Sequence, residues 1–376
     1  MRDSVTIGRV AGITVGINWS WLIVFALIAW TLATGIFPET NPGLADGAYI
    51  AMALVAAVLF FTSLLLHEFG HAFQARREGM EIEGITLWLF GGVAKFSGRF
   101  PSAGAEFRIA IAGPLVSLLL GVGFLLLPTL LPFAAYVDGV LFWLGSINLA
   151  LLVFNLLPAF PLDGGRVLRS LLWKAKGDFL AATHLAAAIG RGFGYLFVAV
   201  GVLFLILLNP VSGIWMAFMG WFLLQAATAE DRSAAAQQAL GGLLVRDVMT
   251  RDPATSPASL TLGQFLDDVM WSEPYTTYPV TENSDAVGLL PFRRVAAVPR
   301  SEWDTRTVGE SMIPRDEILV VSENDDLLEA AAELAEDPVR RALVLDGDRL
   351  VGLLSVTDVA RALEMRGRRG RRPVYR

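Results

Sequence analysis

The sequence contains no cysteine, and this excludes disulfide bonds, thiolate catalysis and cysteine-ligated metal sites. Charged residues are scarce as well: they make up 18% of the 376 residues, whereas hydrophobic residues make up 54%. Soluble domains carry more charge than this, so the composition favours a membrane protein. A cleavable signal peptide is not expected, because the apolar segment that begins at Trp19 is longer than a signal core and lacks a small-residue cleavage site.

The sequence contains several long apolar runs. A helix that crosses a bilayer needs about 20 mostly apolar residues. About six stretches meet this requirement and predict transmembrane helices, near residues 17–37, 47–73, 108–131, 140–157, 185–208 and 212–229.

Lysine and arginine are unevenly distributed among the connections between these stretches. They are absent from residues 38–46, 128–139 and 209–213, and they occur in the alternate connections. By the positive-inside rule the basic connections lie in the cytoplasm, and an even number of spans then places both termini there. Because arginine outnumbers lysine and alanine is abundant, we expect an integral protein of a bacterial inner or plasma membrane.

Residues 81–100 are too short and too interrupted to span a membrane. The apolar residues Ile85, Leu87 and Leu89, followed by Gly91 and Gly92, predict a small β-hairpin whose turn lies at the two glycines. Open strands are not tolerated against lipid, so this hairpin must pack on the helices at the membrane surface.

The second half of the chain has a different texture and an internal repeat. Residues 245–250 match residues 308–313, and residues 286–290 match residues 350–354. Such tandem units favour a soluble, pseudo-symmetric α/β module.

The fold class expected for the whole chain is therefore a polytopic α-helical membrane protein followed by a soluble α/β domain. The predicted domains are a transmembrane domain at 1–229, a linker or helical extension at 230–244, paired repeats at 245–365 (about 245–300 and 308–365) and a basic disordered tail at 366–376.

The strongest chemical signal is the segment from His67 to His71, which reads His-Glu-Phe-Gly-His. Histidines four residues apart share one face of a helix, where their imidazoles can bind one zinc ion. Glu68 follows the first histidine and can take a proton from the zinc-bound water. Only three histidines occur in the chain, and residues 52–66 carry no charge, so ionisable groups placed here predict a function.

A catalytic zinc usually has three protein ligands. His184 lies among charged residues near the fifth span, and we interpret it as an interfacial histidine. Asp163 is the better candidate, because it closes an apolar run on the same side as His71, after Pro158 and Pro161 break the helix. Taken alone, this aspartate fits the cap of an ordinary helix slightly better than a ligand; its pairing with the histidine motif favours the ligand.

Together these motifs resemble the site-2 protease family of intramembrane zinc metalloproteases, over roughly residues 10–229. The resemblance is carried by His67-Glu68-x-x-His71, by Asn155-x-x-Pro158 with Leu162-Asp163-Gly164, by the Gly91-Gly92 hairpin and by Ala112-Gly113-Pro114. The family often has an asparagine where this chain has Ser117, so no role is carried over to that residue.

The resemblance implies one zinc ion per chain, with Asp163 as its third ligand and Glu68 as the general base. It also implies that Asn155 holds the backbone of a substrate near the metal. The hairpin at Gly91 and Gly92 could bind the same substrate by pairing with it as an added strand.

The two C-terminal repeats resemble a pair of CBS domains. In the second, Gly352, Ser355 and Asp358 match the family's nucleotide-binding signature, which implies that the serine meets a phosphate and the aspartate the ribose of an adenine nucleotide. The first repeat has Pro291 and Arg294 at the corresponding positions, so at most one intact site is expected. Dimerisation without any nucleotide is an equal alternative.

We therefore predict an intramembrane zinc endopeptidase that cuts membrane-anchored proteins in regulated proteolysis. The resemblance implies substrates such as anti-sigma factors, a homodimer formed through the CBS pair, and no direct contact with nucleic acid. Two other classes stay open. A CBS-regulated cation transporter would require a polar path across the bilayer, and a catalytically inactive scaffold would share the same fold.

Overall fold

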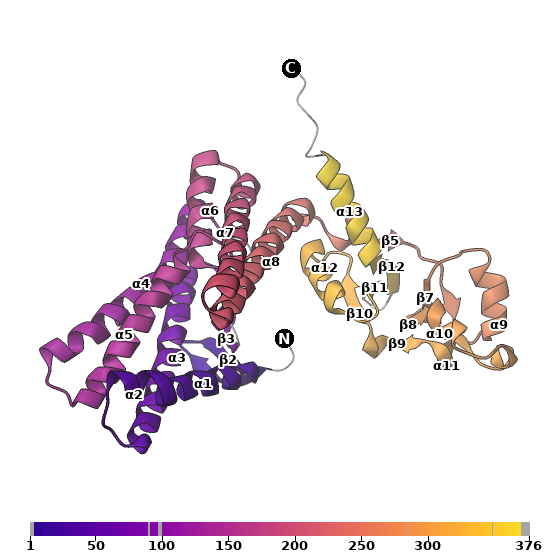
Figure 1. Cartoon of the computed structure of the whole chain (residues 1–376). Helices are drawn as coiled ribbons and strands as arrows, with labels where there is room; N and C mark the ends of the chain where they lie inside the picture. Colours follow the sequence, from indigo (N-terminus) through magenta and orange to yellow (C-terminus); the bar gives the residue numbers. More distant parts are fainter. Residues whose placement is uncertain (1–3, 89–90, 97–99, 284, 348, 370–376) are drawn as a thin grey trace. The chain divides into compact units, whose positions relative to one another are not determined.

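The computed structural model divides the chain into two compact units, Met1–Arg232 and Ser233–Arg376 (Figure 1). The residues that the structure describes are 4–88, 91–96, 100–283, 285–347 and 349–369.

Within the described residues, six helical segments are long and apolar enough to cross a membrane. They are α1 (Ser20–Thr31) continued by a π-helical turn (Leu32–Ile36) and α2 (Phe37–Thr40), then α3 (Asp46–Arg77), α4 (Ala103–Leu130), α5 (Ala135–Asn155), α7 (Phe179–Leu207) and α8 (Pro210–Leu240). A shorter amphipathic helix, α6 (Asp163–Lys176), connects α5 to α7. The expected polytopic helical architecture is confirmed.

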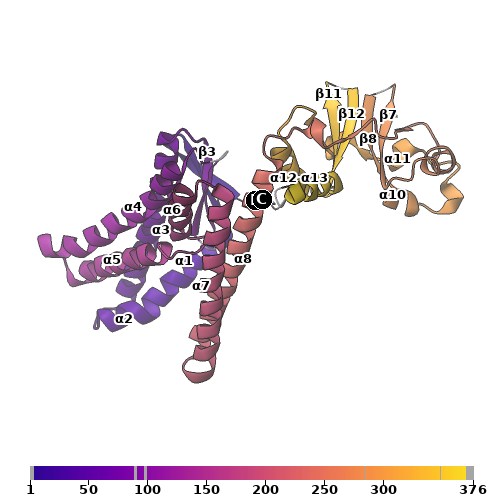
Figure 2. The same cartoon turned by 90° about the horizontal axis from the view of Figure 1, so that it is seen from above.

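Small residues bring neighbouring helices into backbone contact, as is usual where lipid supplies no hydrophobic drive for helix association. A Cβ atom at Gly220 of α8 would lie 2.6 Å from the carbonyl oxygen of Gly194 and 2.6 Å from the amide nitrogen of Val198, both in α7. The two helices accordingly lie side by side in Figures 1 and 2. Gly121 of α4 and Gly145 of α5 allow a similar approach.

The described part of the first unit also contains a four-stranded sheet in the order β1-β2-β3-β4. Its strands are β1 (Ser4–Val10), β2 (Ile13–Asn18), β3 (Ile82–Trp88) and β4 (Gly91–Phe96). The predicted hairpin corresponds to β3 and β4, whereas β1 and β2 were not anticipated. Ile13 and Ile85 of the sheet are buried with Phe69 and Ala72 of α3, so the sheet packs on the helix that carries the histidines.

The expectation of a turn at Gly91 and Gly92 is wrong. Both glycines lie within β4, opposite Trp88 and Leu87 of β3. Residues 89–90, which connect the strands, lie outside the described residues. The reason for glycine here is close approach: a Cβ at Gly92 would overlap the side chain of Glu68.

Residues 230–240, expected to belong to a linker or a helical extension, continue α8 as helix. Alanine is the strongest helix former, and three consecutive alanines occur at 234–236.

The second unit is built on a mixed sheet whose described strands number eight, with the main order β10-β11-β12-β8-β7-β6. The strands are β5 (Thr250–Arg251), β6 (Ser256–Pro257), β7 (Thr277–Glu282), β8 (Asp285–Pro291), β9 (Ile313–Pro314), β10 (Leu319–Ser322), β11 (Arg341–Asp346) and β12 (Arg349–Ser355). The helices are α9 (Leu262–Gln264), α10 (Phe292–Ala296), α11 (Val308–Ser311), α12 (Leu327–Glu336) and α13 (Val356–Arg369). Figure 2 shows α12 and α13 beside β11 and β12, and α10 and α11 beside β7 and β8.

The repeat in the sequence corresponds to an exchange of short strands. β5, from the start of the first repeat, pairs with β12 of the second, and β9, from the start of the second, pairs with β8 of the first. In each case a methionine sulfur packs where a glycine Cβ would be, Met249 against Gly352 and Met312 against Gly288, both 2.6 Å from the Cβ position. The equivalence of these contacts explains the repeated residues.

Candidate metal centre

The two histidines of the motif lie one turn apart on α3, near the end of that helix. Their side chains are 3% and 8% exposed for His67 and His71. Asp163, whose side chain is 13% exposed, is the first residue of α6. A Cβ at Gly165 would lie 2.7 Å from the carbonyl carbon of Ala159, so the segment before α6 folds tightly back onto its first turn.

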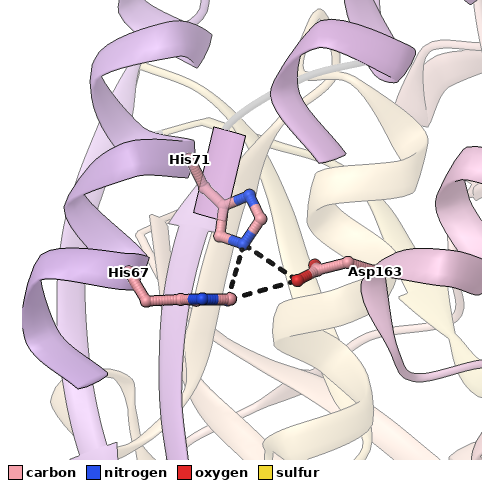
Figure 3. A group of neighbouring side chains, drawn as sticks. All are labelled: His67, His71 and Asp163. Carbon is pink, nitrogen blue, oxygen red and sulfur yellow. Dashed lines mark hydrogen bonds and ion pairs between the residues drawn. The ribbon is translucent and has the colours of Figure 1, made fainter. Parts of the chain in front are cut away.

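The three side chains converge on one point (Figure 3). The Nε2 atoms of His67 and His71 are 3.2 Å apart, and each lies 3.2 Å from Oδ2 of Asp163. Burial by itself would raise the pKa of the Asp163 carboxyl, but the imidazoles of His71 and His67 lower it more. The pKa of the Asp163 carboxyl therefore lies below its usual range when the imidazoles carry the positive charge, and a metal ion bound between neutral rings would supply that charge instead.

Both imidazoles are oriented by α4, through the ring nitrogens that face away from Asp163. Nδ1 of His71 lies 2.7 Å from the carbonyl oxygen of Ile109, and Nδ1 of His67 lies 2.8 Å from Oγ of Ser117. A carbonyl oxygen can only accept, so Nδ1 of His71 donates, and the neutral ring directs the lone pair of Nε2 towards the other two groups.

This arrangement fits zinc. A tetrahedral zinc with bonds of about 2.0–2.1 Å places its ligand atoms roughly 3.3 Å apart. The observed triangle, with 3.2 Å on every side, matches that spacing. The carboxylate is an acceptor, and Nε2 of His71 is one too when that ring is neutral, so a cation bound between them would balance the contact. The three ligand atoms are also the one metal-binding group found among the described residues.

Close backbone approach makes room for this group. A Cβ at Gly113 of α4 would overlap Nε2 of His71 and lie 2.7 Å from Nε2 of His67. A Cβ at Gly70 would lie 2.9 Å from the carbonyl oxygen of Ala112, so α3 and α4 touch along the same line.

The remaining predicted site residues lie at different places around this centre. Glu68 is half-buried, and its side chain lies against Gly92 of β4. Gly91 precedes Gly92 in the same strand and pairs with Trp88 of β3. Asn155 is the half-buried last residue of α5. Its contact with a substrate stays a prediction.

His184 is not brought to the centre. Its Nδ1 pairs with Asp231 of α8, which also pairs with Arg191 of α7 at 3.2 Å. The sequence assigned no role to Ser117, although it lies where the family often has an asparagine. The contact between its hydroxyl and His67 joins α3 to α4, so it cannot be identified before the packing of these two helices is known.

In the second unit, Ser355 and Asp358 line a cavity of about 400 Å³ with Thr250, Tyr275 and Arg361. Oγ of Ser355 donates to Oδ2 of Asp358 at 2.5 Å, and the two residues cap the start of α13. Gly352, predicted as a third ligand residue, packs against Met249 and does not line this cavity.

The corresponding position of the first repeat borders a separate cavity of about 510 Å³, which is lined by Pro291, Phe292 and Arg293. Arg294 instead donates to the carbonyl oxygen of Met312 at 2.7 Å.

Comparisons with known proteins agree on both units. The model of peptidase family M50 matches residues 55–134 and 131–199, which include both histidines and Asp163, and the CBS domain model matches residues 308–365. The protein Rip3 of Mycobacterium tuberculosis is 38% identical over 372 residues, covering 97% of this chain and 94% of that protein.

Zinc metalloprotease MJ0392 of Methanocaldococcus jannaschii is 33% identical over 313 residues, covering 83% of this chain and 85% of that protein. Among solved structures, the site-2 protease from the same organism is 31% identical with a TM-score of 0.43, and the match covers 61% of this chain and 95% of that one.

Proposed function

The chain belongs to peptidase family M50, the site-2 protease family of zinc metalloproteases, and on that premise we propose that it cleaves the membrane-spanning segments of membrane-anchored proteins. The observation that carries this proposal is the triangle of His67, His71 and Asp163, with sides of 3.2 Å, in a unit made of helices apolar enough to cross a membrane. Ligands held on two separate elements, α3 and α6, match a site that binds one metal ion between them.

When bound there, zinc supplies a Lewis acid that polarises a peptide carbonyl and makes water reactive near neutral pH. Glu68 accepts the proton of the attacking water and delivers it to the leaving amine. Glu68 lies next to His67 in the sequence, and its side chain packs against Gly92 of β4. The carbonyl of Ile109 holds His71 in the tautomer that leaves its Nε2 free, and the hydroxyl of Ser117 holds the ring of His67 in place.

A helical peptide bond is screened by its own side chains, so the substrate must unwind before it is cut. Its freed backbone groups then require partners where little water is present. β4 lies at one edge of the sheet and contains Gly92, which contacts Glu68, so an extended substrate paired with β4 would run past the general base. Asn155 holds the same backbone from the end of α5.

The setting of the reaction follows from the flanking regions. The alternation of basic connections supports cytoplasmic termini in a bacterial inner membrane, and substrates of the anti-sigma factor type fit that location. The cavity at Ser355 and Asp358 supports binding of an adenine nucleotide by the C-terminal unit, which regulates the protease and forms its homodimer.

Purified full-length protein in detergent, supplied with a single-span substrate, tests the assignment. We expect Glu68→Gln to retain zinc but to lose activity by about 10²–10⁴-fold, the usual contribution of a general base. His67→Ala and Asp163→Ala should lose the metal itself. Glu39→Gln, an exposed glutamate on α2, is the matched control and should behave like the wild type.

A wild-type protein that binds no zinc, or a Glu68→Gln variant that cleaves at the normal rate, would overturn the proposal. In cells, membranes that contain the Glu68→Gln protein should accumulate an uncut single-span fragment of the natural substrate.

A further inference from the structure

A buried ion cluster lies on the same helix as Asp163 but outside the metal centre. Arg169 of α6 is 2% exposed. Its Nε donates to Oε1 of Glu106 at 2.6 Å, and its Nη1 donates to Oε1 of Glu230 at 2.5 Å. Aromatic rings surround the guanidinium, with centroids 4.9–5.8 Å from its Cζ: Phe100, Phe160 and Phe179.

This cluster joins three helices at one point. Glu106 lies in the first turn of α4 and is fully buried, and its Oε2 has no hydrogen-bond partner among the described residues. Arg169 is therefore the cation that balances this carboxylate. Removing one member of a buried ion pair is strongly unfavourable, because the other charge is left without a partner. The cluster thus sets the position of α6 relative to α4 and α8.

Asp163 and Arg169 belong to one short helix. Six residues of α-helix correspond to a rise of about 9 Å, so the two residues lie less than two turns apart on α6. Phe160, which packs on the guanidinium, lies three residues before Asp163 and is 1% exposed. A shift at Arg169 is therefore transmitted both through α6 and through the segment that leads into it.

Glu230 connects this arrangement to α8. The next residue, Asp231, pairs with His184 and Arg191 of α7, so α8 is attached at this level to α6 and to α7 by separate ion pairs. α8 then continues as helix to Leu240, which is 2% exposed in the core of the second unit. The helix that enters the CBS pair is thus the helix that bonds Arg169.

We infer that Arg169 is a positioning residue: through Glu106 and Glu230 it holds Asp163 against the two histidines and makes this placement depend on the position of α8. The inference rests on the proposed function, because it concerns Asp163 as a zinc ligand. The metal centre and α8 are linked through α6, and such coupling is reciprocal. If the position of α8 raises zinc affinity, zinc binding orders α8 by the same free energy.

Zinc affinity of the full-length protein, measured by competition with a chromophoric chelator, is the first test. Partners that orient a ligand directly contribute 10–100-fold to metal affinity, and we expect Glu230→Gln, which acts one step further away, to weaken binding about 3–10-fold. Arg169→Lys should weaken it similarly, since lysine lacks the fork that bonds two carboxylates together. The two changes should not add in the double variant, because both break one link.

Asp231→Asn is the matched control. It removes the ion pairs between α8 and α7 but leaves the link to α6, so zinc affinity should stay at the wild-type value. Equal zinc affinity in Glu230→Gln and the wild type would overturn the inference, and so would additive losses in the double variant.

Hydrogen exchange provides a readout that a purely structural role would not move. In the wild type and in Asp231→Asn, zinc should slow amide exchange in residues 226–240, and in Glu230→Gln this protection should vanish. Absence of any zinc-dependent protection in a wild type that binds zinc would refute the coupling and leave the protease assignment intact. A wild type that binds no zinc would instead refute the assignment itself.

Discussion

The metal centre of the first unit and the cavity of the second unit are constructed in different ways. At the metal centre, α3 and α6 supply the ligands, and α4 supplies the partners that orient them. At the cavity, Ser355 and Asp358 bond each other three residues apart, as a local cap of α13. The ligands of the first site are held by contacts between residues 38 to 96 positions apart. The contact between Ser355 and Asp358 lies within a single turn of chain, although the cavity that they line also includes Thr250.

The difference follows from the surroundings of each site. Water is scarce within a bundle of apolar helices, so every polar atom there requires a partner from the chain, and several helices must supply them. In a soluble domain, polar side chains can exchange their partners for water or ligand, so a short motif at a helix start can present the oxygens of Ser355 and Asp358. Substitutions far away in the sequence should therefore damage the metal centre more than they damage the Ser355–Asp358 pair.

The largest effect is expected from Gly113→Ala. The new Cβ would overlap Nε2 of His71 and crowd His67, so α4 or the imidazoles must move. We expect zinc affinity to fall by 100-fold or more, on the order of the upper limit for outer partners of a metal site. Gly123→Ala on the same helix is the control, because nothing lies within 4 Å of its Cβ position. Equal zinc affinity in both variants would remove the long-range part of the comparison.

A smaller loss is expected from Ser117→Ala, which removes the hydroxyl 2.8 Å from Nδ1 of His67. Without it the imidazole is free to rotate or change tautomer, and zinc affinity should fall about tenfold, as is common for such partners. Ser63→Ala is matched in burial and lies on α3, where its hydroxyl bonds only the carbonyl of Leu59 in the same helix. It should bind zinc normally; a loss as large as that of Ser117→Ala would point to general loosening.

The smallest effect on the whole protein is expected from Asp358→Asn. Asp358 is the third residue of α13 and accepts from the backbone N–H of Ser355, which the amide oxygen of an asparagine can also do, so stability and zinc content should change little. The ribose contact loses its carboxylate, and ATP affinity measured by calorimetry should fall about tenfold, the value of one charged hydrogen bond. Asp346→Asn, an exposed aspartate at the end of β11, is the control. Normal ATP binding by Asp358→Asn would leave the cavity without its proposed ligand residue.

Local patterns were sufficient for much of the fold. Apolar length predicted all six helices, and the repeated Met and Gly positions predicted the paired module. The strands β1 and β2 were missed: they pair with each other, and β2 gains its other partner, β3, from a segment more than 60 residues further along the chain. The turn proposed at Gly91 and Gly92 was wrong because glycine serves equally well for a turn and for close approach to Glu68.

The sequence alone determined that two histidines share one face of an apolar helix and that a glutamate follows the first of them, because a spacing of four residues matches the helical period itself. It also singled out Asp163 as a candidate ligand, although that residue taken alone fitted a helix cap slightly better. Tertiary structure decided between them, by bringing a carboxylate 96 residues distant to 3.2 Å from an imidazole and by placing Ser117, Gly113 and Arg169 where they support it. Helical periodicity is a property of neighbouring residues, so a short stretch of sequence is enough to predict it. The approach of two helices depends on every side chain packed between them, and these side chains come from distant parts of the chain.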